Sequence, residues 1–231
     1  MTGVSPGALA MERKGSMKSE TILYGYWRSS ATYRTRIALN LKGVPYRTVG
    51  VHLLKDEQTA PEHLARHPSG RVPILEIDGH RIGQSMAMID YLDETRPEPP
   101  LMPRDVALRA LVRDIKDQIV ADIHPLNNTS VLARLRTQFG ADDAAIASWY
   151  EHWIVRGFEV LEQMLPSSGD VCVGNAVTVA DIVLVPQVAN ARRYPQIDLD
   201  RFPNILRIDA ALKKLKPFHD AAPDQQPEAK A

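Results

Sequence analysis

The chain has 231 residues, 44% of them hydrophobic, which is enough for one large domain or two small ones with a substantial core. Lys and Arg together number 28, as do Asp and Glu, and this zero formal net charge argues against a broad nucleic-acid-binding surface. The single cysteine, Cys172, excludes an internal disulfide and a cysteine-rich metal site, and it fits a reducing cytoplasm. The histidines lack the spacing of metal ligands, so we expect no metal.

Both ends of the chain are polar. Residues 1–20 lack the apolar segment of a secretion signal, so we predict a disordered N-terminal extension, within which Met17 is an alternative start. Residues 221–231 are polar and contain proline, and we predict a disordered tail. No apolar run approaches the roughly 20 residues of a membrane span. We therefore expect a cytoplasmic protein with no membrane partner.

Strand-like and helix-like segments alternate through residues 21–95. In chain order, we predict strands at 21–26, 46–53, 72–77 and 80–82, and helices at 31–42, 61–66 and 86–94. The pair Asp78-Gly79 is typical of a hairpin turn and joins the last two strands. The resulting order β-α-β-α-β-β-α is that of a thioredoxin-like domain.

The chain changes character after a proline-rich linker at 96–104. Residues 105–220 show helical spacing and no convincing strand, with predicted helices at 107–123, 142–165, 179–193 and 205–215. Thr178 and Asp181 resemble a capping box before an apolar run, so the third of these helices is expected at the centre of the domain. The predicted fold class is α+β, with an N-terminal thioredoxin-like domain and a C-terminal all-helical domain.

Two serines join the first predicted strand to the first helix. Ser29 and Ser30 place hydroxyls and free backbone N–H groups at the positive end of a helix, which suits an anion such as a thiolate. Arg28, Arg34 and Arg36 strengthen this preference for negative charge. The alternative is that the serines only cap the helix; because a cap and an anion site use the same groups, the two roles are compatible.

Two later segments offer further sites for a peptide-like ligand. A cis Val72–Pro73 bond would turn the backbone of Val72 outward to pair with an extended ligand, whereas a trans proline would only mark a strand edge. Gln84 and Ser85 begin a predicted helix, where they either cap it or bind the carboxylate of an α-amino acid.

Taken together, these segments resemble the glutathione transferase superfamily and, within it, the zeta class, whose best-known members are maleylacetoacetate isomerase and maleylpyruvate isomerase. The zeta signature Ser-Ser-Cys-x-x-Arg-x-Arg-Ile-Ala-Leu is matched at 29–39, with Ala31 in place of the cysteine. The resemblance continues through 41–43, 84–87, 123–128 and 185–193.

The resemblance implies a homodimer that binds glutathione between its two domains. The glutathione contacts that it implies are Ser29, Ser30, Ala31, Thr32, Tyr33, Arg34, Gln58, Val72, Gln84, Ser85, His124, Asn128, Thr129 and Ser130. For His124 a second interpretation stays open, that it caps the end of its helix. Arg28 and Arg193 would line a pocket for an acidic substrate, with Arg192 on the surface.

The implied activity is glutathione-dependent conversion of 4-maleylacetoacetate, a small dicarboxylic substrate, to 4-fumarylacetoacetate in aromatic amino acid catabolism by reversible thiolate addition. Ser29 and Ser30 would hold the thiolate, while Arg28 and Arg193 would neutralise carboxylate and enolate charge. Because Ala31 replaces the family's cysteine, no protein thiol acts here. The alternatives are maleylpyruvate isomerisation, glutathione transfer or dehalogenation of small α-halo acids, and a non-catalytic glutathione-fold binding protein.

Overall fold

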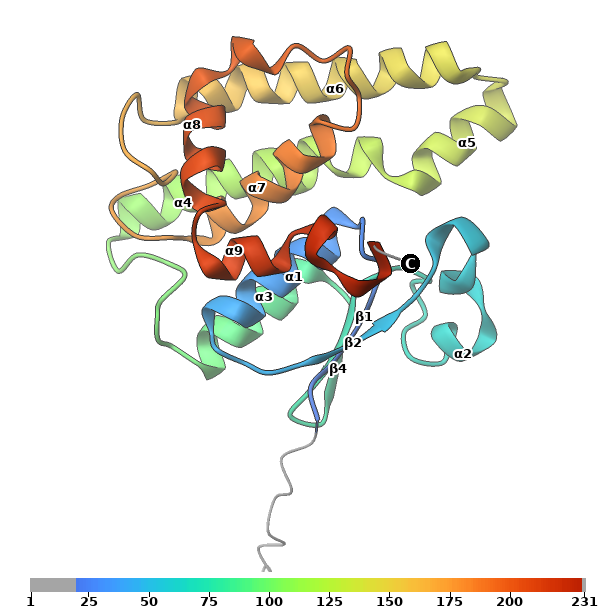
Figure 1. The fold of residues 1–231 in the computed structure, drawn as a ribbon, viewed down its shortest axis with the longest axis horizontal. Helices are drawn as coiled ribbons and strands as arrows, with labels where there is room; N and C mark the ends of the chain where they lie inside the picture. Colours follow the sequence, from blue (N-terminus) through green and yellow to red (C-terminus); the bar gives the residue numbers. More distant parts are fainter. Residues whose placement is uncertain (1–19, 230–231) are drawn as a thin grey trace, which may run out of the picture.

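The N-terminal part of the chain folds around a four-stranded sheet. The computed structural model describes residues 20–229 and orders the strands β2-β1-β3-β4. Strand β1 (Ile22–Gly25) runs parallel to β2 (Arg47–Gly50) and antiparallel to β3 (Ile74–Ile77), which pairs antiparallel with β4 (His80–Ile82). In Figure 1 this sheet lies in the lower half of the molecule.

The hairpin between β3 and β4 has the chemistry that its sequence predicts. Asp78 and Gly79 have φ of 52° and 80°, so both turn residues adopt the left-handed conformation that Asp-Gly pairs tolerate. Ile77 pairs with His80 across the turn, which confirms the predicted hairpin.

Three helices belong to this sheet, and they lie close to the predicted ranges. They are α1 (Ser30–Leu41), α2 (Pro61–Leu64) and α3 (Ser85–Thr95). Two short 3-10 turns, Leu53–Lys55 and Glu57–Thr59, precede α2 where a loop was expected. Helix α1 packs against α3 on one side and against the helical domain on the other, so its N-terminus lies at the junction of the two domains (Figure 1).

The rest of the chain is helical, and the thioredoxin-like plus all-helical fold is confirmed. Its helices are α4 (Val106–Asp117), the π-helix η3 (Gln118–Ile123), α5 (Thr129–Phe139), α6 (Asp143–Met164), α7 (Val179–Ala191), α8 (Pro203–Leu212) and α9 (Lys216–Ala221). None of the helices within residues 20–229 is both long and apolar enough to cross a bilayer. The domain boundaries 21–95, 96–104 and 105–220 remain our proposal.

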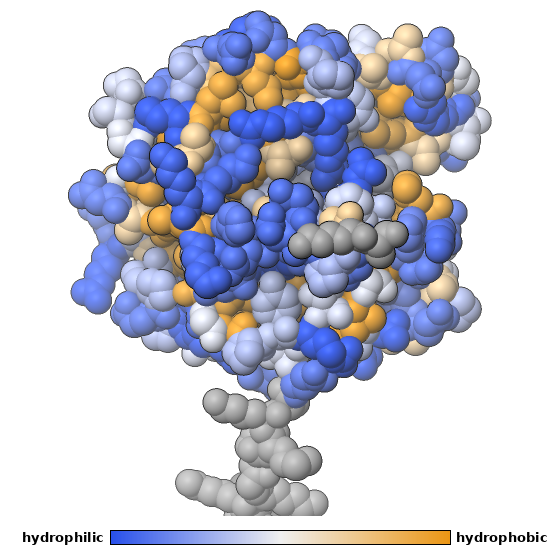
Figure 2. All heavy atoms as spheres, in the orientation of Figure 1, coloured by the Kyte–Doolittle hydropathy of each residue, from blue (hydrophilic) through white to orange (hydrophobic). Residues whose placement is uncertain are grey.

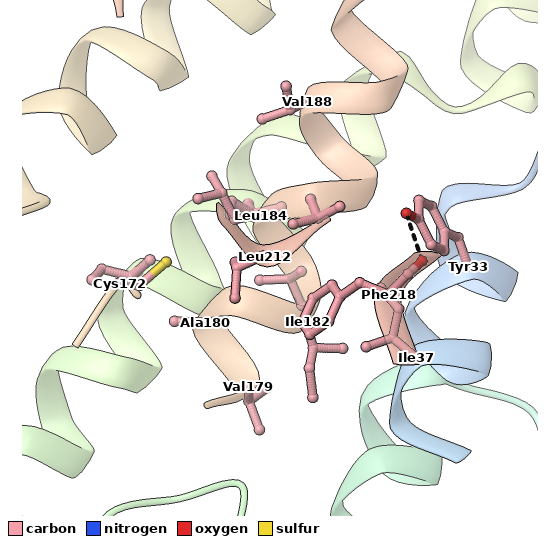
Figure 3. Close-up of a cluster of buried hydrophobic side chains, with 14 of the residues drawn as sticks. Tyr33, Ile37, Cys172, Val179, Ala180, Ile182, Leu184, Val188, Leu212 and Phe218 are labelled. Carbon is pink, nitrogen blue, oxygen red and sulfur yellow. Dashed lines mark hydrogen bonds between the residues drawn. The ribbon is translucent and has the colours of Figure 1, made fainter. Parts of the chain in front are cut away.

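Helix α7 forms the centre of the helical domain, as the capping box predicts. The carboxylate of Asp181 accepts hydrogen bonds from the backbone N–H of Thr178 and of Cys172, both at 2.7 Å. Figure 3 shows α7 side chains packed against Ile37 of α1 and Phe218 of α9. Burial, and then the Asp181 carboxylate, raise the pKa of the Cys172 thiol, which suits an inert thiol.

Two helices were missing from the sequence prediction. Helix α5 buries none of its residues, so no strong apolar period marks it. Helix α9 has 6 residues and begins with Lys216-Pro217, which is too short for a periodic pattern. Both helices are stabilised by packing against other elements: α5 contacts α6, and α9 contacts α1.

The C-terminal segment differs from the predicted disordered tail at 221–231. The chain leaves α9 at Ala221 and makes two 3-10 turns, Pro223–Gln225 and Pro227–Ala229. Gln226 is buried, and its Nε2 donates to the carbonyls of Asp220 and Ala222 at 2.9 and 2.8 Å. The predicted extension at 1–20 lies, except for Glu20, outside the described residues.

A glycine permits close packing between α6 and the π-helix η3. A Cβ on Gly157 would lie 2.2 Å from Cδ1 of Ile123, the residue before His124. We expect Gly157→Ala to lower the free energy of unfolding by about 1–3 kcal/mol, because the extra methyl group overpacks this contact. Urea unfolding of the two proteins measures the difference. A stability equal to the parent's would show that η3 can shift without loss.

Candidate active site

The loop between β1 and α1 presents the serine pair at the domain junction. Ser29 is the N-cap of α1, and its Oγ accepts a hydrogen bond from the backbone N–H of Thr32 at 3.2 Å. Its own O–H is left available to donate, since capping uses only the oxygen lone pair. Ser30 is the first residue of the helix and is 5% exposed. The geometry therefore accommodates both predicted roles, capping and anion binding.

Arg28 and Arg193 lie beside each other although 165 positions separate them in the chain. The Arg193 guanidinium, just beyond the C-terminus of α7, donates to the backbone carbonyl of Arg28. The residue as a whole keeps much of its exposure, but packing desolvates its guanidinium, and this, together with the Arg28 charge, lowers the pKa of Arg193. Two neighbouring cations close in sequence and space to Ser29 create a local positive potential that favours an anionic ligand.

Arg34 is a buried cation without a counter-charge among the described residues. It is 2% exposed, and its Nε and Nη2 atoms have no hydrogen-bond partner within residues 20–229. Burial lowers its pKa to about 10, so it is still charged at neutral pH. Because a buried unpaired charge is strongly destabilising, the site calls for an anion or ordered polar groups at this position.

His124 follows the π-helix η3 and faces Arg34 and Arg71. Burial lowers its pKa to about 3, and the positive charges of these two arginines contribute to the shift. Its Nδ1 is buried without a partner among the described residues, so the ring does not cap the preceding helix. This leaves the neutral imidazole without a hydrogen-bond partner that a ligand at the domain junction could supply.

The desolvated, neutral imidazole of the half-buried His124 predicts a specific acid sensitivity. Because the folded pKa lies below the unfolded value near 6.5, stability is fully present above that value and is lost as pH falls from about 6.5 to about 3. We expect His124→Gln to remove up to about 1.4 kcal/mol of this loss per pH unit. Urea unfolding at several pH values measures it, with the two proteins matched at pH 8 as baseline. Parallel stability curves down to pH 4 would contradict the assignment.

The Val72–Pro73 peptide bond is cis, which is the first of the two predicted possibilities. The β1–β3 pairing begins at Ile74, so no strand partner within residues 20–229 occupies the backbone of Val72. This backbone remains able to pair with an extended ligand.

Gln84 and Ser85 lie at the N-terminus of α3. Gln84 has an extended backbone with φ of −118°, is exposed, and makes no capping hydrogen bond with its side chain. The helical hydrogen bonds of α3 begin with the N–H of Met88, which donates to the carbonyl of Gln84, so the N–H groups before Met88 have no helical acceptor. The N–H groups of this first turn are therefore free for a carboxylate, and the buried Ser85 lies among them.

The remaining predicted contacts are distributed unevenly. Gln58 donates to Asp56 at 3.2 Å, while its Oε1 atom is buried without a partner among the described residues. Asn128 caps α5 by accepting from the backbone N–H of Ser130 at 3.0 Å, and Thr129 and Ser130 are exposed. The amide group of Asn128 is thus engaged locally, which leaves less of it for a ligand.

Two predicted contacts, Tyr33 and Thr32, have side chains that are buried within the protein. Tyr33 is 1% exposed, and its hydroxyl donates to the carbonyl of Phe218 at 3.3 Å. Its backbone N–H donates to the backbone carbonyl of Ser29. Thr32 is fully buried against Gly25. The neighbouring Ala31 is half-buried and carries only a methyl group. The motif match extended the contacts to Tyr33, but helical rotation points this side chain into the core.

The sequence analysis missed Asn127 and Arg71. Asn127 is 6% exposed, and both polar atoms of its amide lack a partner within residues 20–229. It follows His124 by three positions, in the 3-10 turn Pro125–Asn127. Asn127 lies within the 123–128 segment that resembles the zeta class but was not named as a contact, whereas Arg71 lies outside every such segment. Its nearness to His124 is seen only in the folded structure.

Comparisons with known proteins agree with this geometry. A family model described as glutathione S-transferase, N-terminal domain, matches residues 19–94. The probable maleylacetoacetate isomerase of Vibrio cholerae is 46% identical over 212 residues, which are 90% of this chain and 98% of that protein. A holo structure of maleylpyruvate isomerase, a bacterial zeta-class glutathione transferase, matches with a TM-score of 0.87 and 44% identity, covering 90% of this chain and 99% of its own.

The chain belongs to the zeta class of glutathione transferases. This confirms the resemblance drawn from the sequence. A further relative is the maleylacetoacetate isomerase of Methylobacterium extorquens, solved with bound malonate and glutathione. It has a TM-score of 0.87 and 35% identity, and the match covers 91% of this chain and 100% of that one.

Several features of the chain fit the glutathione of this family. Buried polar atoms without partners occur on Arg34, Gln58 and His124, and the first turn of α3 is uncapped. A tripeptide with a thiol, two carboxylates and peptide groups would supply the missing partners. The zeta-class site in this chain is therefore built for a charged, extended ligand.

Proposed function

We propose that this zeta-class protein is a glutathione-dependent cis–trans isomerase that converts 4-maleylacetoacetate to 4-fumarylacetoacetate. The observation that carries the proposal is the meeting of Arg28 and Arg193 beside the free hydroxyl of Ser29. An isomerase for a doubly acidic substrate needs this combination, because it must hold a thiolate and neutralise carboxylates at the same place. Relatives named as maleylacetoacetate isomerases, 46% identical over 90% of this chain, support the same assignment.

We assign glutathione to the junction of the two domains. The residues that would hold it are Ser29, Ser30 and Arg34 of the α1 region, Gln58, the backbone of Val72, Gln84 and Ser85, and His124 with the neighbouring 128–130 segment. Its γ-glutamyl carboxylate fits the free N–H groups at the start of α3. Tyr33 is left out of this set because its side chain and N–H are engaged within the protein.

Each residue of the site then has a task. When bound, glutathione supplies a thiolate that adds reversibly to the cis double bond and so permits rotation. Ser29 donates a hydrogen bond that keeps the sulfur ionised, aided by the positive end of α1. Arg28 and Arg193 hold the substrate carboxylates and balance charge that develops during the reaction. Ala31 offers no competing thiol.

Maleylpyruvate isomerisation is the second candidate. The solved maleylpyruvate isomerase covers 90% of this chain at 44% identity, which supports it. The chain has Thr129-Ser130 after its asparagine pair, whereas some maleylpyruvate isomerases carry arginines there, and this favours the maleylacetoacetate substrate.

We also propose a homodimer located in the cytoplasm. The exposed apolar side chains Val106, Leu108 and Leu111 on α4 support a partner surface, with exposed fractions of 79%, 39% and 36%. A single buried cysteine with a raised pKa supports a reducing compartment.

An absorbance assay on both maleyl substrates, with and without glutathione, tests the proposal. We expect glutathione-dependent turnover of maleylacetoacetate with no net loss of the thiol. Stoichiometric loss of glutathione with halide release from α-halo acids would favour a transferase. Binding of glutathione without turnover of any of these compounds would favour a non-catalytic binding protein.

A further inference from the structure

One face of α1 binds the C-terminal helix through three side-chain donors. The hydroxyl of Tyr33 donates to the carbonyl of Phe218 at 3.3 Å, a bond drawn in Figure 3. Nε of Arg36 donates to the carbonyl of Ala221 at 2.8 Å, and Nδ2 of Asn40 donates to that of Pro217 at 3.0 Å. The three donors are spaced at i, i+3 and i+7, so they share one helix face.

Arg36 differs from the other two donors because it makes a second bond. Its Nη2 donates to the backbone carbonyl of Trp27 at 3.1 Å, while the side chain is 1% exposed. Trp27 directly precedes Arg28 and Ser29. The planar guanidinium of Arg36 therefore joins the C-terminal helix to the loop that carries the site residues.

The loop receives a second guanidinium from the opposite side. Arg193, following α7, donates to the carbonyl of Arg28, the residue after Trp27. Two successive carbonyls of the loop are thus held by arginines from two different helical segments. The loop's own backbone contributes one turn bond, from the N–H of Ser29 to the carbonyl of Tyr26 at 2.9 Å. The two arginines hold the carbonyls of Trp27 and Arg28, which lie within that turn.

We propose that Arg36 is a positioning residue, which fixes the Trp27–Ser29 loop against α9 so that the C-terminal segment sets the placement of the Ser29 hydroxyl and the Arg28 charge. The inference rests on the proposed function of this loop. Arg36 touches no substrate atom and acts only through the backbone that it holds.

The surroundings of Arg36 fit a structural cation that stays charged. Burial lowers its pKa to about 10, opposed by Tyr46, Tyr33 and Glu228 of the C-terminal turn. The outer surface over α9 is largely hydrophilic in Figure 2, whereas the helix buries Phe218 and Ala221 in the core. The hydrogen bonds from α1 and the burial of Phe218 together hold α9 in place.

Arg36→Lys is the test variant, and Asn40→Ala is its matched control. Lysine keeps the charge but cannot bond both carbonyls at once. Asn40→Ala breaks the same α1–α9 contact without touching the loop. We expect Arg36→Lys to lower kcat by about 10- to 100-fold through misplacement of the loop, and to change the dissociation constant of glutathione by less than about threefold, because most of its contacts are elsewhere. Asn40→Ala should keep kcat within about threefold of the parent, on the scale of an independent site.

The ultraviolet titration of the bound thiol gives a readout that needs no turnover. We expect Arg36→Lys to raise the thiol pKa of bound glutathione toward about 8.5, the ordinary value, since Ser29 is displaced. If the parent turns over no maleyl substrate, this titration still decides the role of Arg36, so the two proposals fail separately. Equal loss of kcat in both variants would overturn the inference. So would failure of Arg36→Lys and Arg36→Gln to fold while Asn40→Ala folds, because Arg36 would then serve only stability.

Discussion

Ser29→Ala is expected to lower kcat for the maleyl substrate by roughly 10²–10³, the scale of losing one preorganised donor to a developing or resident anion. The hydroxyl of Ser29 is free to donate because its oxygen only accepts from the N–H of Thr32. The thiol pKa of bound glutathione should rise in parallel, since the thiolate loses its hydrogen bond. Steady-state kinetics and ultraviolet titration of the thiol measure the two effects.

The same substitution removes the N-cap of α1, which by itself costs about 1 kcal/mol of stability. Ser29→Asp separates the two roles. Aspartate caps a helix as well as serine does and suits its N-terminus, so the unfolding midpoint should not fall. Its carboxylate cannot donate at neutral pH and repels a thiolate, so turnover should be lost at least as completely as in Ser29→Ala. Full activity in either variant would transfer the thiolate role to Ser30 or to the backbone.

Arg193→Ala is expected to raise KM for the acidic substrate by about 10- to 100-fold, because a hydrogen bond to a charged group contributes about 1.5–3 kcal/mol. A smaller loss of kcat should accompany it, since the carbonyl of Arg28 loses the bond from Arg193. Initial-rate kinetics with varied substrate at saturating glutathione separate the two constants.

Arg192 is the matched control for Arg193. It turns the other way, and its Nη1 lies 2.6 Å from the carboxylate of Asp209, which is 1% exposed on that side chain. Arg192→Ala should leave KM unchanged and lower the free energy of unfolding by about 1–3 kcal/mol, discounted for the exposure of Arg192. Lys213, at 3.4 Å, keeps part of the compensation. An Arg193→Ala variant with parental KM would remove that residue from the pocket.

Local signals were sufficient for a large part of the fold. The Asp-Gly turn, the serine cap of α1 and the capping box before α7 are each satisfied by neighbours within a few residues, so the chain specifies them directly. The order of strands and helices in the first domain follows from the same local patterns. The zeta-class signature at 29–39 identified the family, and the family resemblance then implied the overall fold.

Tertiary structure decided the parts that depend on distant segments. The meeting of Arg28 with Arg193, the inward turn of Tyr33, and the docking of α9 onto α1 each join groups more than 150 positions apart. Helix α5 was not predicted from the sequence, because it buries none of its residues and so carries no clear apolar pattern. Caps, turns and helical periodicity depend on residues that are close in the sequence, so they can be predicted from it. The direction of a side chain and its distant partner depend on how the helices pack together, which a local pattern does not specify. The sequence by itself determined most of the helices and strands and the anion-binding end of α1. Only the packed domains determined which cations meet there and what holds their loop.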